Sequence, residues 1–513
     1  MPILDWLNRD ETVKVADHVS YRLLEAVDDL SAGDKDSPNM LIQGDNLEAL
    51  KALLPYYAGQ VKCIFIDPPY NTRSAVSIHY DDNLEHSQWL TMMYPRLELL
   101  RELLAEDGSI WVTVDDSEAH YLKVIMDEVL GRKNFIGVAA WEKSDSPRMD
   151  AVFFSYRHDN VIAFAKNIDA VLFKRLSSDE IPEHYNRTDE QDRRYYTKPL
   201  RAMGGQGETR EARPTLYYAI TAPDGAEVYP KKQDGSDGAW RWNKEKVELE
   251  KDRIDWVNGR NGWVPYYRIY ADNIKDRPAE TIWFHAEVGT NRTSKAEIKA
   301  LNLSEKAFDT PKPERLMQRI IEISTNKGDI VLDSFLGSGT TAAVAHKMSR
   351  RYIGIEMGEH AKTHCAPRLQ KVIEGEQGGI SEAVEWKGGG GFRFYELGST
   401  IFDADGNINP KIRFPHLAAH IWFSETKTAH PANKRKSPLL GVHGDTAYYL
   451  LYNGILGDKS ISGGNVLTSK TLAMLPKHDG PKIVYGETSR LSPARLKALN
   501  IVFKQTPYDI KAR

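Results

Sequence analysis

The chain has 513 residues, of which 27% are charged and 41% hydrophobic, and its formal net charge at pH 7 is −4. Single hydrophobic cores stop growing near about 250–300 residues, so this length predicts more than one compact unit. No apolar stretch approaches the roughly 20 residues of a membrane span, and the first residues lack a signal-peptide pattern. The two cysteines fit a reducing cytoplasm, and no Cys/His spacing predicts a metal site.

Residues 40–170 alternate predicted strands with predicted helices. Beta–alpha alternation gives a largely parallel sheet with helices on both faces, so we expect an α/β fold here. The strands are expected at 61–66, 108–114, 134–141 and 160–165, and the helices at 89–104 and 121–130.

The strand at 61–66 ends in Asp67-Pro68-Pro69-Tyr70. Proline has no N–H and fixes φ, so the turn is stiff and its carbonyls are left to accept hydrogen bonds. Open α/β sheets place ligands at the carboxyl ends of their strands. A carboxylate and carbonyls beside a flat ring suit a planar group that bears an exocyclic NH2. A simple strand-ending turn is the alternative for these four residues alone.

Residues 171–285 change in character, because short aromatic runs alternate there with basic residues. Basic groups meet phosphates and read base edges, while aromatic rings stack on unpaired bases. The alternative is a small β-rich domain whose aromatic residues form its own core. We expect most of the aromatic residues to be core and the Arg and Lys residues to contact DNA.

A glycine-rich loop, Asp333 to Ala342, follows a strand at 330–332 and opens a helix. Gly337, Gly339 and Ala342 satisfy the dinucleotide-binding pattern, and Glu356 follows about 20 residues on, where a ribose-binding acid is expected. Alone, this pattern fits NAD as well as any other adenosine cofactor. A phosphate-binding P-loop is disfavoured because no Lys follows the second glycine. A tight strand-to-helix turn is the structural alternative.

Together the two motifs resemble the amino-group DNA methyltransferases that use S-adenosylmethionine. The Asp-Pro-Pro-Tyr form resembles the adenine-N6 enzymes, and the order, with this motif before the glycine loop, resembles their circularly permuted beta class. Residues 283–293 look like the modification (Mod) subunits of type III restriction–modification systems. Residues 41–50 resemble the segment that closes over the adenine ring of the cofactor, and 308–316 the segment that holds its methionine end.

The resemblance implies a circularly permuted, Rossmann-like S-adenosylmethionine-dependent methyltransferase fold with an inserted target recognition domain and a smaller α/β C-terminal domain. The implied domains are an N-terminal extension at 1–39, a catalytic domain at 40–170 and 286–386, the recognition domain at 171–285, and a dimerisation or docking domain at 387–513 behind a glycine-rich hinge at 387–391.

The implied site residues fall into three sets. The catalytic set is Asp67, Pro68, Pro69 and Tyr70. The cofactor-binding set is Asp45, Phe308, Thr310, Lys312, Asp333, Phe335, Gly337, Gly339, Thr340 and Glu356. The DNA-binding set is Arg193, Arg194, Arg213, Arg241, Lys244, Arg260 and Arg292.

The predicted activity is methyl transfer from S-adenosylmethionine to N6 of a flipped adenine in duplex DNA. The expected partners are DNA, a second copy of the chain and a restriction subunit, in the cytoplasm. Three alternatives stay open: a cytosine-N4 methyltransferase, a nicotinamide-dependent oxidoreductase with the same glycine loop, and a DNA-binding subunit whose activity has lapsed.

Overall fold

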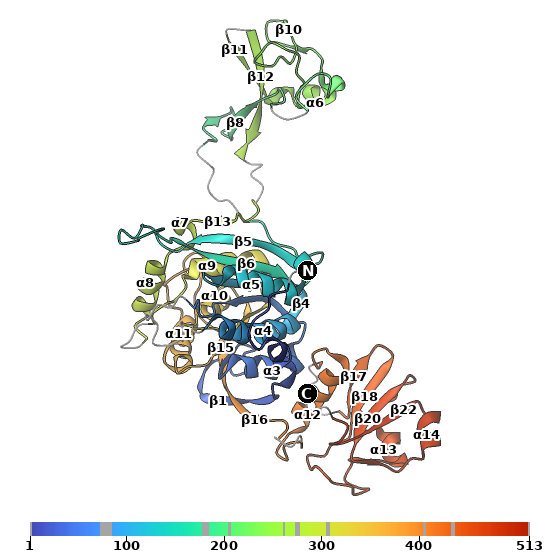
Figure 1. The fold of residues 1–513 in the computed structure, drawn as a ribbon. Helices are drawn as coiled ribbons and strands as arrows, with labels where there is room; N and C mark the ends of the chain where they lie inside the picture. Colours follow the sequence, from blue (N-terminus) through green and yellow to red (C-terminus); the bar gives the residue numbers. More distant parts are fainter. Residues whose placement is uncertain are drawn as a thin grey trace. The chain divides into compact units, whose positions relative to one another are not determined.

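The computed structural model describes residues 3–71, 85–176, 184–203, 207–259, 262–271, 277–303, 308–403, 407–431 and 437–510. The chain separates into two compact units (Figure 1). The first combines Met1–Lys174 with Glu280–Arg513, and the second is Arg175–Ala279. In the described part of the chain, no helix combines the length and the apolar character needed to cross a bilayer.

A ten-stranded sheet forms the centre of the first unit. Neighbouring strands from β16 to β4 are parallel, whereas β1 pairs antiparallel with β16, and β6 pairs antiparallel with both β4 and β5. The sheet is therefore largely parallel, as predicted. In spatial order its strands are β1 (Arg22–Gly33), β16 (Gly391–Thr400), β2 (Met40–Gln43), β15 (Arg351–Glu356), β14 (Ile330–Asp333), β3 (Val61–Ile66), β4 (Leu104–Val114), β6 (His158–Ala165), β5 (Phe135–Glu142) and β13 (Ile282–Trp283).

The central pair of strands joins the two distant motifs. β3 ends at the Asp67 turn, β14 ends at the glycine loop, and the two are parallel neighbours with Leu332 opposite Ile64. Because parallel strands end at the same edge of a sheet, the two motifs open on one edge. The expectation that segments from both sides of the inserted region form one sheet is confirmed.

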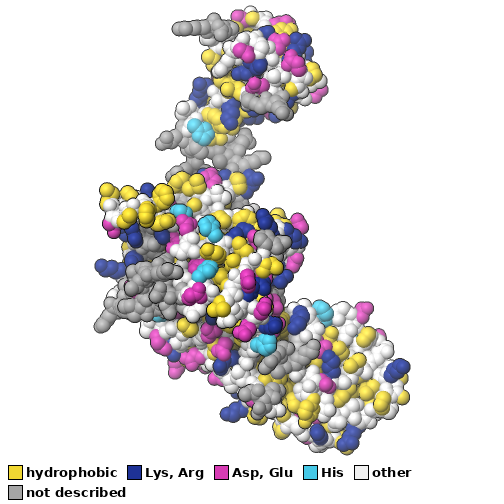
Figure 2. Space-filling view, viewed as in Figure 1, with side chains coloured by type: hydrophobic (Ala, Val, Ile, Leu, Met, Phe, Trp, Pro, Cys, Tyr) yellow, Lys and Arg dark blue, Asp and Glu magenta, His cyan; other side chains and the backbone are white. Residues whose placement is uncertain are grey.

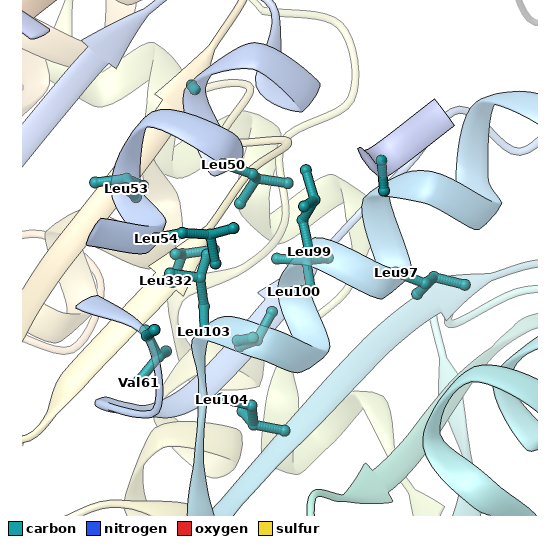
Figure 3. Packing of buried hydrophobic residues seen from close by; sticks show 14 of the residues in the cluster. Leu50, Leu53, Leu54, Val61, Leu97, Leu99, Leu100, Leu103, Leu104 and Leu332 are labelled. Atoms are coloured by element: carbon teal, nitrogen blue, oxygen red, sulfur yellow. The ribbon is translucent and has the colours of Figure 1, made fainter. Parts of the chain in front are cut away.

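Helices cover both faces of this sheet, with α3 and α4 on one face and α9 and α10 on the other (Figure 1). Leucines of α3 and α4 pack with Val61 and Leu332, and the labelled residues are at most 2% exposed (Figure 3). Up to residue 426, the described α-helices of the unit are α1 (Arg9–Thr12), α2 (Val15–His18), α3 (Asn46–Tyr57), α4 (His86–Leu103), α5 (Ala119–Met126), α7 (His285–Val288), α8 (Asn291–Leu301), α9 (Glu314–Ser324), α10 (Thr340–Lys347), α11 (Ala366–Ile373) and α12 (Phe414–Thr426).

Two helices differ from their predicted bounds for local reasons. α4 begins at His86 rather than Trp89, because the Glu85 carboxylate caps it by accepting from the N–H of Ser87 at 3.0 Å. α5 is shorter than predicted, because a π-helical turn over Asp127–Gly131 replaces its last part.

The sheet also takes in β1 from residues 1–39 and β16 from residues 387–513, both of which we expected outside the catalytic domain. The predicted glycine hinge is instead a packed turn that leads into β16. Gly389 donates its N–H to the Ile373 carbonyl at 2.7 Å, and the Gly390 carbonyl accepts from Asp34 at 3.0 Å. Gly388 to Gly390 have positive φ, which explains the glycines without a hinge.

The C-terminal part of the first unit carries a second, smaller sheet in the order β17 (Leu439–His443), β18 (Thr446–Leu450), β20 (Lys482–Gly486) and β22 (Ile501–Gln505). The helix α14 (Pro493–Ala498) lies between β20 and β22 in the chain, so this part mixes strands and helices as the predicted α/β domain does. A strand pair, β19 (Val466–Leu467) with β21 (Thr488–Ser489), and α13 (Ser469–Met474) complete this part.

The second unit is small and rich in strands. Its sheet has the order β11 (Ile254–Gly259), β12 (Gly262–Tyr270), β8 (Arg194–Pro199) and β7 (Arg187–Thr188), beside a hairpin of β9 (Ile220–Thr221) and β10 (Glu227–Val228) and the helix α6 (Lys244–Leu249). Trp240 is buried in its core, and Trp242, Trp256 and Tyr267 pack against that core. Tyr185, Tyr195 and Tyr270 are also buried, whereas most of the other aromatic residues here are only partly buried. The expectation that most of them are core is therefore met only in part.

Candidate active site

A cavity of about 320 Å³ opens where β3 and β14 end. Four segments far apart in the sequence line it. The turn after β3 supplies Asp67, Pro68, Pro69 and Tyr70, and the glycine loop supplies Asp333, Phe335, Gly337 and Thr340. The segment before α9 supplies Phe308, Thr310 and Lys312, and the β5–β6 hairpin supplies Lys143, Arg148 and Asp159. Eleven of the fourteen residues in the predicted catalytic and cofactor-binding sets therefore meet here.

The Asp67 carboxylate is held at both of its oxygens. Oδ1 accepts from the Thr113 hydroxyl at 2.6 Å, and Oδ2 forms an ion pair with the Lys312 ammonium. We expected Lys312 to bind the cofactor, but its nearest partner is this carboxylate. The Lys312 ammonium also lies 5.2 Å from the centre of the Tyr70 ring, so one cation contacts both ends of the motif.

The two prolines of the motif use their carbonyls differently. The Pro69 carbonyl accepts from the indole N–H of Trp89 at 2.7 Å, which ties the turn to α4. The Pro68 carbonyl makes no hydrogen bond to any residue that the structure describes. Pro68 therefore keeps a carbonyl available for a ligand next to the Asp67 carboxylate.

Asn71, the residue after the motif, is held by a hydrogen bond to Glu118. Asn71 is buried, has a φ of 56° and donates from Nδ2 to the buried Glu118 carboxylate at 2.8 Å. The same carboxylate lies 2.8 Å from Nδ1 of His86, the first residue of α4. Asn tolerates this left-handed conformation better than most residues. Glu118 thus holds the chain on both sides of residues 72–84.

Tyr70 and Asp159 form the polar wall facing Asp67. Burial raises the pKa of Tyr70 well above its ordinary value, and the negative charges of Asp159 and Asp67 add to that shift. Asp159 is 2% exposed and accepts from the Lys143 ammonium at 2.6 Å. Burial raises the pKa of Asp159, although the pairing with Lys143 opposes the shift.

The glycine loop is shaped by the acid that begins it. Asp333 accepts from the N–H of Phe335 at 2.9 Å and from the Thr341 hydroxyl at 2.6 Å. Burial raises the pKa of Asp333 to about 7, with smaller contributions from the charges of Asp67 and Glu356. Although Asp333 lines the cavity, its carboxylate mainly organises the turn from β14 into α10.

The two glycines of the loop have different surroundings. Gly337 has a φ of 57° and lines the cavity, and a Cβ added there would lie 3.2 Å from the Phe308 ring. Gly339 has a φ of 81°, and a Cβ there would meet the Cα of Cys365 at 3.3 Å. Gly339 is outside the cavity lining, and the positive φ and the close approach of Cys365 account for a glycine there. Its contact with a cofactor stays a prediction.

Glu356, the expected ribose acceptor, ends β15 directly behind the loop. Its Oε2 accepts from the N–H of Gly337 at 2.7 Å, and its Oε1 from that of Gly358 at 3.2 Å. It is buried and lies outside the cavity lining. In this structure the carboxylate therefore supports the backbone on both sides of it, and its contact with a ribose stays a prediction.

Asp45 also lies outside the cavity lining. It caps α3, where its Oδ1 accepts from the N–H groups of Leu47 and Glu48, and its Oδ2 pairs with Arg96 at 3.1 Å. The side chain therefore has a structural function, and its contact with a cofactor stays a prediction.

The predicted DNA-binding residues differ in whether they have a partner within the chain. Arg193 pairs with Asp189 at 2.7 Å and lies over the Tyr270 ring, while the Arg194 guanidinium donates to the Tyr185 carbonyl. In the first unit, Arg292 pairs with Asp145 at 3.2 Å and keeps 76% of its side chain exposed. In the second unit, Arg213, Arg241 and Lys244 are exposed, as is Arg194 despite its hydrogen bond. Arg260 lies outside the described residues.

Four residues of the site carried no motif signal: Thr113, Lys143, Arg148 and Asp159. Thr113 and Asp159 lie on paired strands beside β3, and an acid within the apolar strand at 158–165 is the one signal that could have indicated a site. Over the residues described, no group of three or more His, Cys, Asp or Glu side chains could hold a metal ion.

Comparison with known proteins places this cavity in a family. The profile of the DNA methylase family (N6_N4_Mtase) matches residues 61–366, which is more than half of the chain and runs from β3 beyond the glycine loop. The chain belongs to this DNA methylase family. Membership confirms the predicted resemblance and the α/β methyltransferase fold, and it decides against the nicotinamide-dependent oxidoreductase. The family name covers N6 and N4 enzymes alike.

Among individual proteins, the chain is similar to Mod subunits of type III restriction-modification enzymes. The chain is 33% identical over 420 residues to the probable type III restriction-modification enzyme HindVI Mod subunit of Haemophilus influenzae, covering 73% of this chain and 56% of that protein. It is 30% identical over 393 residues to the EcoPI Mod subunit of Escherichia phage P1, covering 67% and 60%. The chain thus spans little more than half the length of these relatives.

Among solved structures, the M1.HpyAVI–SAM complex is similar at 15% sequence identity and a TM-score of 0.34, covering 64% of this chain and 98% of that one.

Proposed function

We propose that this DNA methylase transfers a methyl group from S-adenosylmethionine to N6 of adenine in duplex DNA, as the Mod-type subunit of a restriction–modification system. One observation carries the proposal: the Asp67 carboxylate, oriented by Thr113 and Lys312, lies in the same cavity as the glycine loop. The aspartate form of the motif supports adenine rather than cytosine as the target.

The exocyclic amine of a base has little nucleophilicity of its own, and the residues of the site have to raise it. Its lone pair is delocalised into the ring, so it is a poor nucleophile. The Asp67 carboxylate and the Pro68 carbonyl accept hydrogen bonds from its two N–H groups. These two hydrogen bonds draw the nitrogen toward a tetrahedral geometry and localise its lone pair. Lys312 and Thr113 hold the Asp67 carboxylate in a fixed orientation, and orientation of this kind is worth up to about 7–11 kcal/mol.

The residues that line the cavity fit S-adenosylmethionine. Phe308 and Phe335 offer flat apolar faces for an adenine ring, and Gly337 leaves room that a Cβ would fill. The Thr310 and Thr340 hydroxyls offer polar contacts. Glu356 does not line the cavity, but its carboxylate lies directly behind Gly337, and we assign the ribose hydroxyls to it. When bound, this cofactor supplies an electrophilic methyl group on a sulfonium.

A base inside a duplex cannot reach Asp67, so the target has to leave the stack, at a cost of a few kcal/mol. Tyr70, beside Asp67 in the cavity, is positioned to stack on the extruded base. We assign sequence recognition to the second unit, because its exposed cations stand on a compact aromatic core. Exchange of residues 175–279 for the matching segment of a relative should then change the methylated sequence but not the methylated atom.

The partners are proposed from the relatives, which are named as Mod subunits of type III restriction-modification enzymes. We infer a restriction subunit, a second copy of the chain and cytoplasmic DNA as the partners. Size measurements of the purified chain, alone and with a neighbouring restriction protein, test the first two. A monomer that binds no such protein would overturn them.

The decisive experiment incubates the purified chain with labelled S-adenosylmethionine and genomic DNA, followed by nucleoside analysis. N6-methyldeoxyadenosine at one sequence is expected. N4-methyldeoxycytidine would establish the alternative target, which the same two acceptors could serve. No transfer to any DNA, with intact binding, would indicate a subunit whose activity has lapsed. Mapping of the modified positions gives the recognition sequence needed below.

A further inference from the structure

The loop between β5 and β6 exposes an unusual group of large apolar side chains. Met149, Val152, Phe153 and Phe154 are 93%, 87%, 91% and 80% exposed. The loop projects beyond the end of the two strands, and hydrophobic side chains gather at that place (Figures 1 and 2). A contiguous apolar group of this kind marks an interaction surface more often than scattered single residues do.

The loop has a defined shape despite its exposure. The Ser155 hydroxyl accepts from the N–H of Arg148 at 2.6 Å, and Arg157 donates from Nε to the Ser144 carbonyl at 3.1 Å. The Arg157 guanidinium also pairs with Glu142 at 2.5 Å. These bonds close the base of the loop, so its apolar tip is held out from the sheet.

The base of the loop is also a wall of the cavity. Lys143, Arg148 and Asp159 all line it, together with Asp67 and Tyr70. Arg148 has no ion-pair partner among the residues described and is therefore available to a phosphate. The apolar tip is thus continuous with the place where the reacting base has to enter.

We propose that this loop enters the DNA duplex at the target site, with Phe153 and Phe154 taking the space in the stack that the extruded base leaves. The proposal rests on the proposed function. Apolar side chains are frequently inserted between base steps, where they offset part of the unstacking cost. Every duplex substrate imposes the cost of unstacking the target base. The gap that this base leaves in the DNA is therefore the partner that we assign to the exposed Phe153 and Phe154.

The test compares two duplexes that carry the mapped site. In one the target adenine is paired, and in the other it faces an abasic position, where a base leaves the stack at lower cost. The variant Phe153→Ser/Phe154→Ser should lose at least about tenfold in the rate of transfer to the paired duplex. On the abasic duplex its rate should approach that of the wild type. Tyr508→Ser, at an aromatic residue that is 80% exposed elsewhere in the unit, is the matched control.

Equal loss on both duplexes, or no loss on either, would overturn the proposal. The proposed function fails separately, when the wild-type chain transfers no methyl group to DNA. Cofactor affinity and thermal unfolding of the variant should match the wild type, because both side chains are exposed.

A second measurement does not depend on catalysis. Cys63 and Cys365 are buried, so Phe153→Cys introduces a single accessible thiol. Alkylation of that thiol should slow on addition of the cognate duplex, whereas alkylation of Tyr508→Cys should not. Protection without DNA, which increases with protein concentration, would instead assign the loop to contact between two copies of the chain and overturn the proposal.

Discussion

The cavity of the first unit and the surface of the second unit treat their charges in opposite ways. In the cavity, burial raises the pKa of Asp333 to about 7, and Asp67 and Asp159 are each paired with a lysine. In the second unit, hydrogen bonds from Lys231 and Arg210 lower the pKa of Asp237 to about 2. The cavity therefore holds charges that burial disfavours, and the second unit holds charges that are well solvated and balanced.

The cavity is therefore suited to a reaction, and the surface of the second unit is suited to contact with a polyanion. Buried pairs fix the positions of a few side chains, which suits a reaction at one atom. Exposed cations on a small rigid core can contact a long polyanion at several places. Arg213, Arg241 and Lys244 have no ion-pair partner within the described part of the chain and are exposed, whereas Arg193 and Arg268 are paired with acids.

The largest effect is expected at the centre of the cavity. Asp67→Ala removes the carboxylate acceptor and should lower methyl transfer by at least about 100-fold, because the amine loses one of its two acceptors. Binding of S-adenosylmethionine and of DNA should stay close to the wild-type values in calorimetry. Asp36→Ala, at an exposed position, is the control. Transfer within about tenfold of wild type would remove Asp67 from the mechanism.

The next effect concerns the exposed cations of the second unit. Replacement of Arg213, Arg241 and Lys244 by Ala should weaken DNA binding at low salt and flatten its salt dependence, by about 0.9 in the log–log slope for each phosphate that is no longer neutralised. Arg268→Ala, which removes a cation paired with Asp255 at 2.6 Å, should leave that slope unchanged. An equal change of slope in both variants would show that a cation paired with an acid contacts DNA as well as an unpaired one does.

A smaller effect is expected behind the glycine loop. Glu356→Ala should weaken S-adenosylmethionine binding by about tenfold or more, since hydrogen bonds to a charged group are worth about 1.5–3 kcal/mol. Raised cofactor concentration should restore the lost activity. Glu382→Ala changes an exposed acid and serves as the control. Unchanged affinity would mean that Glu356 only supports Gly337, as it does in the structure.

The smallest effect is one of pH on stability. Asp333 has a pKa of about 7 in the fold, above its ordinary value of 3.8. Between these values the folded chain retains a proton that the unfolded chain has lost, so stability falls as pH rises through this window and levels off above it. Asp333→Asn should remove that part of the slope, worth about 1.4 kcal/mol per pH unit at most. Urea unfolding at pH 5 and 7 measures the difference, with Asp36→Asn as the control. An unchanged slope in Asp333→Asn would contradict the assignment.

Much of this division could be predicted from the sequence. Strand periodicity and the two motifs placed Asp67 and the glycine loop at one edge of one sheet, and composition predicted an aromatic core for the second unit. The partners of Asp67 could not be predicted, because Thr113 and Lys312 reach it only through tertiary packing. Asp45 was predicted as a cofactor residue although its place before a helix is also an N-cap signal, and the structure uses it as that cap.

Two other differences between the predictions and the structure also come from tertiary contacts. The glycine run at 387–391 has the composition of a flexible linker, but its conformation is set by hydrogen bonds to residues distant in sequence, among them Asp34 and Ile373. Arg148 belongs to no motif and enters the cavity only because the β5–β6 hairpin folds toward it. Local pattern predicts elements and their ends, whereas side-chain partners depend on which elements meet.

The adjacency of β3 and β14 also has a consequence for how the protein is made. These neighbouring strands are separated in the chain by the whole second unit, so their pairing has a very large sequence separation, and such contacts form late and slowly. A nascent chain that ends after the second unit carries Asp67 but has neither the glycine loop nor the central neighbour of β3. During synthesis, therefore, the second unit can complete its own core while the edge of β3 still awaits its partner. The two walls of the cavity that follow β3 and β14 can therefore come together only after β14 and the glycine loop have been synthesised.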